Sequence, residues 1–123
     1  MSFVTLSKQT INHQLQMATI FSKSLTRTDI ENRLAVPKQA LKLLPNFGDR
    51  HRVCIRAKDH GGYFWSFECS IRRNGHPKPV LACSNWLAFV RYWDLRVGDT
   101  IQLHRERDEF TGVEFKIVVQ VAD

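Results

Sequence analysis

The chain has 123 residues, of which 43% are hydrophobic, and this is enough for one globular domain with a buried core. No stretch approaches the roughly 18 apolar residues that a membrane-spanning helix requires, so we expect no membrane partner. The net charge is +6, and it is unevenly distributed. Residues 1–90 carry 13 Lys and Arg against 5 Asp and Glu, whereas residues 91–123 carry 5 against 7. Such a basic region suits a polyanionic partner, although a mild positive charge can also serve solubility alone.

The cysteines and the N-terminus indicate a reduced protein without a secretion signal. Three cysteines, Cys54, Cys69 and Cys83, each lie in an apolar run, and an odd number argues against a disulfide framework. We expect all three to be buried packing residues, and no Cys or His spacing indicates a metal site. No compact apolar block follows a basic start, so we expect residues 1–18 to be a loosely ordered lead-in and residues 19–123 to be the domain.

The first patterned stretch, residues 21–45, contains a proline that divides it. Residues 28–31 have the Thr-x-x-Glu form of a capping box, but a helix that began there would reach Pro37 after about two turns. Val36 precedes that proline and is therefore biased away from helical geometry, whereas Pro37 suits the first position of a new helix. The stretch is thus predicted to form a strand (21–25), a polar excursion (26–33), a short strand (34–36) and a helix (37–44).

From residue 52 onward the sequence mostly alternates with the period of a β-strand. Residues 52–57 and 63–69 are predicted strands of a hairpin, joined by a turn that contains Gly61 and Gly62. Residues 70–79 contain two prolines and an Asn-Gly pair, so they form a predicted protruding loop. A strand (80–83) and a helix follow; Ser84 could cap this helix, whose apolar residues recur with helical spacing up to Trp93. Residues 100–105 and 113–121 complete the predicted strands, after a turn at Gly98 and Asp99.

Many short strands with two short helices are typical of an antiparallel barrel or pseudobarrel. Five aromatic residues are expected in its core rather than as base-stacking platforms: Trp65, Phe67, Trp86, Phe89 and Trp93. Two basic excursions, 26–33 and 70–79, are predicted to leave this body. Cations can bind phosphates and amide side chains can read base edges, so two such arms could grip a nucleic acid.

Four segments occur in a fixed order over residues 20–121: FSKSLTRTD, RLAVPKQA, FWSFE and NWLAFVRYWDLRVGDTIQL. In this order they resemble the plant B3 DNA-binding domain family, known from auxin response factors and reproductive-meristem proteins. The resemblance implies a mainly β fold, a seven-stranded open barrel (pseudobarrel) with two short α-helices. It also implies a nuclear transcription factor, or its DNA-binding domain, that grips the major groove of double-stranded DNA between two arms without metal or cofactor. A homodimer or other transcription regulators are further partners to consider.

The candidate DNA-binding residues lie on these two arms. The first arm contributes Lys23, Ser24, Thr26, Arg27, Thr28, Glu31, Asn32 and Arg33, and the second contributes Arg72, Arg73, Asn74, Gly75, His76 and Lys78. The threonines could bond phosphates or only cap the local turn, and Glu31 could accept from cytosine N4. In an extended loop Arg72 and Arg73 point to opposite sides, so we expect one of them to face DNA. The first arm is shorter than in many family members, and Pro79 stands where auxin response factors carry Arg.

Functions other than sequence-specific DNA binding differ in how well they fit the sequence. The sequence has no Gly-rich phosphate loop, nucleophile elbow or paired carboxylates, so we expect no enzymatic activity. A B3-like fold could instead serve protein association or non-specific DNA binding. The DNA-targeting domain of a restriction endonuclease is a lesser alternative, because such modules look similar to B3 domains.

Overall fold

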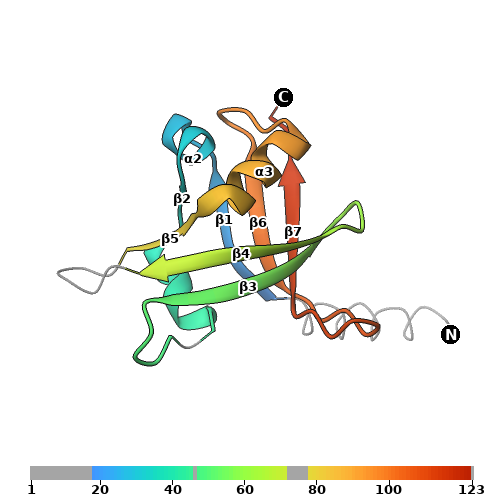
Figure 1. The fold of residues 1–123 in the computed structure, drawn as a ribbon. Helices are drawn as coiled ribbons and strands as arrows, with labels where there is room; N and C mark the ends of the chain where they lie inside the picture. Colours follow the sequence, from blue (N-terminus) through green and yellow to red (C-terminus); the bar gives the residue numbers. More distant parts are fainter. Residues whose placement is uncertain (1–17, 46, 72–77, 123) are drawn as a thin grey trace, which may run out of the picture.

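The computed structural model describes residues 18–45, 47–71 and 78–122, apart from the side chain of Cys83. Its elements, labelled in Figure 1, are β1 (Ala18–Ser24), α2 (Arg27–Glu31), β2 (Leu34–Ala35), the 3-10 helix η1 (Lys38–Leu43), β3 (Arg52–Asp59), β4 (Phe64–Ile71), β5 (Pro79–Ala82), α3 (Cys83–Trp93), β6 (Thr100–Arg105) and β7 (Phe115–Gln120). The predicted candidates Arg72, Arg73, Asn74, Gly75 and His76 lie outside the described residues.

Seven strands form one curled sheet in the order β1-β6-β7-β3-β4-β5-β2. All neighbours are antiparallel except β3 and β7, which are parallel over residues 57–59 and 115–117. The edge strands β1 and β2 are not paired with each other, so the barrel stays open between them. The predicted seven-stranded open barrel is therefore confirmed.

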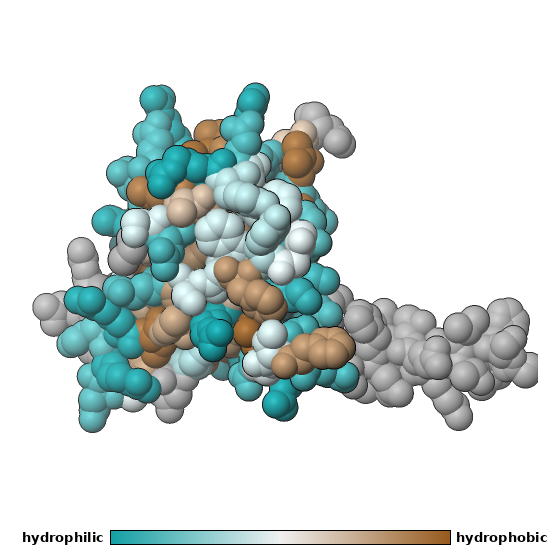
Figure 2. Space-filling view, turned by 45° about the vertical axis from the view of Figure 1, so that its right-hand side comes forward, coloured by the Kyte–Doolittle hydropathy of each residue, from teal (hydrophilic) through white to brown (hydrophobic). Residues whose placement is uncertain are grey.

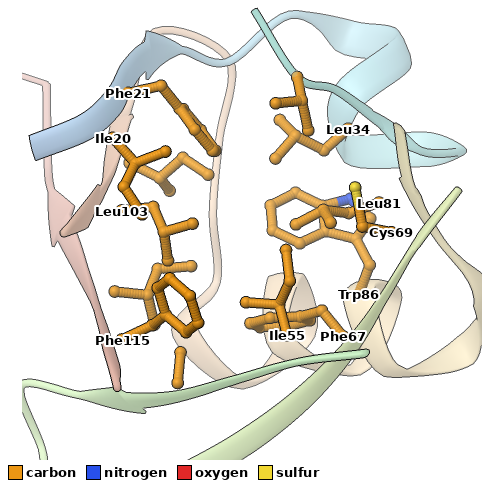
Figure 3. Packing of buried hydrophobic residues seen from close by; sticks show 14 of the residues in the cluster. Ile20, Phe21, Leu34, Ile55, Phe67, Cys69, Leu81, Trp86, Leu103 and Phe115 are labelled. Carbon is orange, nitrogen blue, oxygen red and sulfur yellow. The ribbon is translucent and has the colours of Figure 1, made fainter. Parts of the chain in front are cut away.

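The inward faces of the strands and the apolar face of α3 form one core. Val53, Ile55 and Ala57 of β3 are buried and alternate with exposed residues, as the period-two pattern predicted. Figure 3 shows Phe67 of β4 and Trp86 of α3 among the side chains that fill the interior. Trp65 and Trp93 are only half-buried but pack against this core.

The predicted helices need correction. Residues 26–33 are not only a polar excursion, because α2 forms within them and its capping box joins Thr26 to Asp29 rather than Thr28 to Glu31. The helix predicted over residues 37–44 is a 3-10 helix over Lys38–Leu43 rather than an α-helix. Pro37 precedes it with an extended ψ of 136°, and the Pro37 carbonyl accepts from Ala40 N at 2.9 Å.

The second predicted helix and one cysteine also differ from expectation. Helix α3 starts at Cys83 without a side-chain cap, so Ser84 is inside the helix rather than its cap. Cys69 is buried, but Cys54 is exposed because it alternates with Val53 and Ile55 and faces outward from β3. The apolar run around Cys54 therefore did not indicate burial.

Candidate nucleic-acid interface

The first arm spans the opening of the barrel. The chain leaves edge strand β1 after Ser24, forms α2, and returns as edge strand β2 at Leu34 (Figure 1). Its start is fixed by the predicted turn at residues 98–99: Leu25 N donates to Asp99 O at 2.8 Å, and Gly98 N donates to Leu25 O at 3.0 Å. Gly98 adopts a φ of 96°, which favours glycine.

A buried carboxylate holds the arm to both edge strands. Asp29 is 1% exposed, and its Oδ1 accepts from Lys23 Nζ of β1 at 3.0 Å and from the backbone nitrogen of Ala35 in β2 at 3.1 Å. Its Oδ2 accepts from Thr26 N at 2.8 Å, while the Thr26 hydroxyl accepts from Asp29 N at 3.3 Å. These bonds join β1, α2 and β2 through one side chain.

The electrostatics of Asp29 agree with this role. Burial alone would raise the pKa of this carboxyl, but the hydrogen bonds from the Thr26 and Ala35 backbones and from Lys23 outweigh burial and lower the pKa below its ordinary value. The carboxylate therefore stays ionised beneath an arm whose exposed face carries cations.

Helix α3 supplies a third attachment. The indole nitrogen of Trp86 donates to the backbone oxygen of Asp29 at 2.8 Å, across 57 positions of sequence. Trp86 is fully buried and packs edge-to-face on Phe67. The arm thus rests on the aromatic core rather than only on its own turn.

Lys23 is committed to this inner framework. Besides Asp29, its ammonium donates to Ala35 O at 2.8 Å, and its side chain is 21% exposed. Because a lysine ammonium has three donor hydrogens, only one remains for another partner. We therefore assign Lys23 first to holding the arm across the barrel opening.

The remaining first-arm candidates are exposed: Ser24, Thr26, Arg27, Thr28, Glu31, Asn32 and Arg33. Arg27 Nε and Glu31 Oε2 form an ion pair at 2.9 Å on this surface. Exposed pairs of this type contribute only about 0.5 kcal/mol, so either side chain can leave it readily. Within the described residues, the Arg33 side chain has no hydrogen bond or ion pair.

The second arm begins and ends beside the first. Strand β4 ends at Ile71, which pairs with Pro79 of β5, and Pro79 O accepts from Val36 N at 3.0 Å just after β2. Lys78, at the end of this loop, is exposed. The sheet edge formed by β5 and β2 therefore carries both arms.

A groove of about 490 Å³ joins the two arms, and its described lining residues are Arg33, Ser70, Ile71, Lys78 and Val80. Arg33 comes from the first arm and Lys78 from the second, so two cations distant in sequence border the same space. None of these five residues is acidic. The described lining of the groove offers two cations, one hydroxyl and two apolar side chains to a ligand.

Sequence reasoning missed Asp29 as a structural centre of the arm. The Thr26-x-x-Asp29 spacing was a visible signal of a helix start, but the hydrogen bonds of Asp29 with Ala35 and Trp86 depend on tertiary structure.

Among the described residues, no group of three or more His, Cys, Asp or Glu could hold a metal ion. The described helices are also too short or too polar to span a membrane.

Comparison with known proteins relates this fold to a named family. A search of protein-family models gave no match. A B3 domain-containing protein of Oryza sativa subsp. japonica is 35% identical over 88 residues, which cover 67% of this chain and 45% of the rice protein. The chain thus spans less than half the length of this curated relative.

Solved structures share the fold over most of the chain. The protein in the Arabidopsis FUS3–DNA complex has a TM-score of 0.72 and 26% identity, with 85% of this chain and 99% of that chain covered. The Arabidopsis thaliana transcription factor LEC2 in its DNA complex has a TM-score of 0.70 and 20% identity, with 87% and 96% covered. A hypothetical protein of Arabidopsis thaliana has a TM-score of 0.57 at 18% identity, with 87% and 93% covered. The last two likenesses concern the fold alone.

Proposed function

This chain is a plant B3 domain, and from that premise we propose that it binds double-stranded DNA sequence-specifically, with its two arms in the major groove. It would act in the nucleus as a transcription factor or as the DNA-binding domain of one. Binding rather than catalysis is its role in this proposal, and it needs no metal or cofactor.

One observation carries the proposal: Arg33 and Lys78, from different arms, border one groove without an acidic neighbour in its described lining. A phosphate is a strong acceptor for both side chains, and binding releases the counterions condensed on DNA. The half-buried Ile71 and Val80 of the same lining can contact the apolar face of a sugar or the methyl group of thymine.

We assign different tasks to the arm residues. Arg27, Arg33, Lys78 and one of Arg72 and Arg73 contact phosphates, with help from the hydroxyls of Ser24 and Thr28. Asn32, Asn74 and His76 are the candidates for reading base edges, because amide and imidazole groups offer directional donors and acceptors. The Thr26 hydroxyl caps α2, and Lys23 with Asp29 sets the position of the first arm.

Selection of bound sequences from a random pool of duplexes tests specificity, and anisotropy titration at several salt concentrations tests phosphate contact. We expect an enriched motif, and an affinity that falls as salt rises. Arg33→Gln and Lys78→Gln should each weaken all duplexes to a similar degree and reduce the salt slope by about one.

The matched control is Arg91→Gln, which removes an exposed cation on α3 away from the groove. Its affinity for duplex DNA should stay close to that of the unaltered protein. Salt-independent binding would contradict the phosphate contacts. The absence of any enriched motif would leave non-specific binding or protein association as the better account.

A further inference from the structure

The turn between α3 and β6, residues 96–99, lies at the same end of the barrel as α2 (Figure 1). Hydrophilic side chains project from this upper end of the molecule, as Figure 2 shows. Asp99 is nevertheless buried in the turn, with only 5% of its surface exposed. A buried carboxylate requires hydrogen-bond donors, so the donors of Asp99 show which segments it holds together.

The Asp99 side chain closes its own turn and binds the segment after β7. Its Oδ2 accepts from Arg96 N at 2.8 Å, and the backbone nitrogen of Asp99 donates to Arg96 O at 3.0 Å. Its Oδ1 accepts from Ala122 N at 2.9 Å, two residues after β7 ends at Gln120. One carboxylate therefore joins the turn before β6 to the segment that follows β7.

The same turn holds the start of the first arm. Leu25 lies between β1 and Thr26, the N-cap of α2, and both of its backbone groups bond to the turn. Its nitrogen donates to Asp99 O at 2.8 Å, and its oxygen accepts from Gly98 N at 3.0 Å. The direction in which the chain leaves β1 therefore depends on the position of this turn, which the Asp99 carboxylate fixes.

Backbone N–H groups rather than a cation hold the charge of this carboxylate. Among the described residues no lysine or arginine forms an ion pair with Asp99, and the Arg96 guanidinium pairs with the exposed Asp94 at 3.2 Å. Hydrogen bonds from the backbone nitrogens of Ala122 and Arg96 lower the pKa of Asp99 below its ordinary value. The group is therefore ionised at neutral pH, and its bonds are lost if either segment moves.

We propose that Asp99 is a positioning residue for DNA binding, and that it makes the position of the first arm depend on the segment after β7. This inference rests on the proposed function, in which the first arm carries Arg27 and Arg33 to the phosphates. An arm held in place loses little conformational entropy when a duplex binds, whereas a loosened arm must first be ordered. Asp99 acts only through the arm, because its own side chain is buried.

Asp99→Asn tests this role. An amide side chain has a single acceptor oxygen, so either Arg96 N or Ala122 N would face its NH₂ group instead of an acceptor. The first arm should loosen, and affinity for the selected duplex should fall by about tenfold. Because the substitution also removes a negative charge, which alone would favour DNA, the fall has to arise from the position of the arm.

Ala122→Pro is a second variant that leaves the carboxylate itself unaltered. Proline has no backbone N–H, so Oδ1 of Asp99 loses a donor, and duplex affinity should fall by about threefold. Ala122→Ser keeps this donor and should bind like the unaltered protein. Asp94→Asn is the matched control for charge, because Asp94 is exposed and its φ of 50° is one that asparagine tolerates. Its duplex affinity should not fall.

Anisotropy titrations at several salt concentrations separate a positioning role from a phosphate contact. Asp99→Asn should keep the salt slope of the unaltered protein, whereas Arg33→Gln should reduce that slope by about one. Amide hydrogen exchange of the free protein locates the change. In Asp99→Asn, exchange should accelerate more at Leu25 and Ile30 of the first arm than at Ile55 in β3. Thermal unfolding shows whether each variant is folded under these conditions.

Three results would each overturn the inference. Asp99→Asn could bind duplex as tightly as Asp94→Asn, Ala122→Pro could bind as tightly as Ala122→Ser, or exchange in Asp99→Asn could accelerate equally in the first arm and in β3. Failure of the proposed function has a different signature, because the unaltered protein itself would then bind no duplex. Hydrogen exchange would in that case decide alone whether Asp99 holds the arm.

Discussion

The indole nitrogen of Trp86 donates to the backbone oxygen of Asp29, so the first turn of the α3 helix supports the turn that spans the barrel opening. Trp86→Phe keeps an aromatic ring in the core but leaves this buried carbonyl without its donor. We expect the free energy of unfolding to fall by about 2–4 kcal/mol, from the lost hydrogen bond and the smaller ring. Urea unfolding measures that loss. Relative to the unaltered protein, Trp86→Phe should accelerate amide hydrogen exchange more in α2 than in β6. Equal acceleration in both elements would show that Trp86 supports the core in general rather than this arm.

Asp29 itself gives a prediction about pH. Its pKa lies below its ordinary value of 3.8 in the folded protein, so its ionised form stabilises the fold above that value. The contribution should be fully present at neutral pH and should be lost as the pH falls from the ordinary value through the lower folded-state pKa. Asp29→Asn should lower the free energy of unfolding by about 1–3 kcal/mol at pH 7. The loss is no larger because Lys23 can turn its ammonium towards solvent.

The measurement compares urea unfolding of the two proteins between pH 7 and pH 3. The difference in unfolding free energy between them should be constant near neutral pH and should shrink below about pH 4. Asp99 and Asp108 also have lowered pKa values, so the difference between the two proteins is informative and the pH dependence of either alone is not. A difference that stays constant down to pH 3 would contradict the ionised role of Asp29.

The strands were predictable because their signal is local. Alternation in residues 52–57 places every second side chain on one face, and burial of Val53 and Ile55 follows without knowledge of their partners. The start of α2 was not predictable in the same way. Thr26-x-x-Asp29 and Thr28-x-x-Glu31 are both local capping patterns, and only the tertiary contacts of Asp29 decide between them.

The candidate site was also predictable only where its signal is local. The sequence predicted two basic arms, but the shared groove of Arg33 and Lys78 arises from the pairing of β4, β5 and β2. The charge of Lys23 likewise indicated a phosphate contact, whereas its bonds to Asp29 and Ala35 direct it inward. A charge is visible in sequence, but its existing partner is not.

The cysteines are expected to differ in reactivity. Burial raises the pKa of the Cys69 thiol to about 12, so this residue has almost no thiolate at pH 8, whereas Cys54 is exposed on β3. In a Cys83→Ser background, a maleimide reagent at pH 8 should modify Cys54 within minutes and Cys69 only after the protein unfolds. Peptide mass mapping with and without urea distinguishes the two. Equal labelling of both in the folded protein would show that β4 opens more readily than its burial indicates.

Asn74 is predicted to read a base, and its effect should differ from that of a phosphate contact. Asn74→Ala should reduce the difference in binding free energy between the best duplex and random duplexes by about 1–3 kcal/mol, which is the usual discrimination of a bidentate base contact. Lys78→Ala should instead weaken both duplexes alike. Competition titrations at one salt concentration measure the two ratios, and an unchanged gap for Asn74→Ala would remove it from the base readers.

Glu31 is the one exposed carboxylate of the first arm, and its ion pair with Arg27 partly neutralises the arm. Glu31→Gln removes a negative charge near the phosphates and frees Arg27 to bind one of them. Affinity for random duplexes should therefore rise several-fold and the salt slope should steepen by up to about one, while stability changes by no more than about 0.5 kcal/mol. Glu109→Gln, on the exposed β6–β7 connection, is the matched control for a general change in net charge. If Glu31 reads a cytosine amino group, Glu31→Gln will instead weaken the best site selectively, and the same titration separates these two outcomes by the sign of the change.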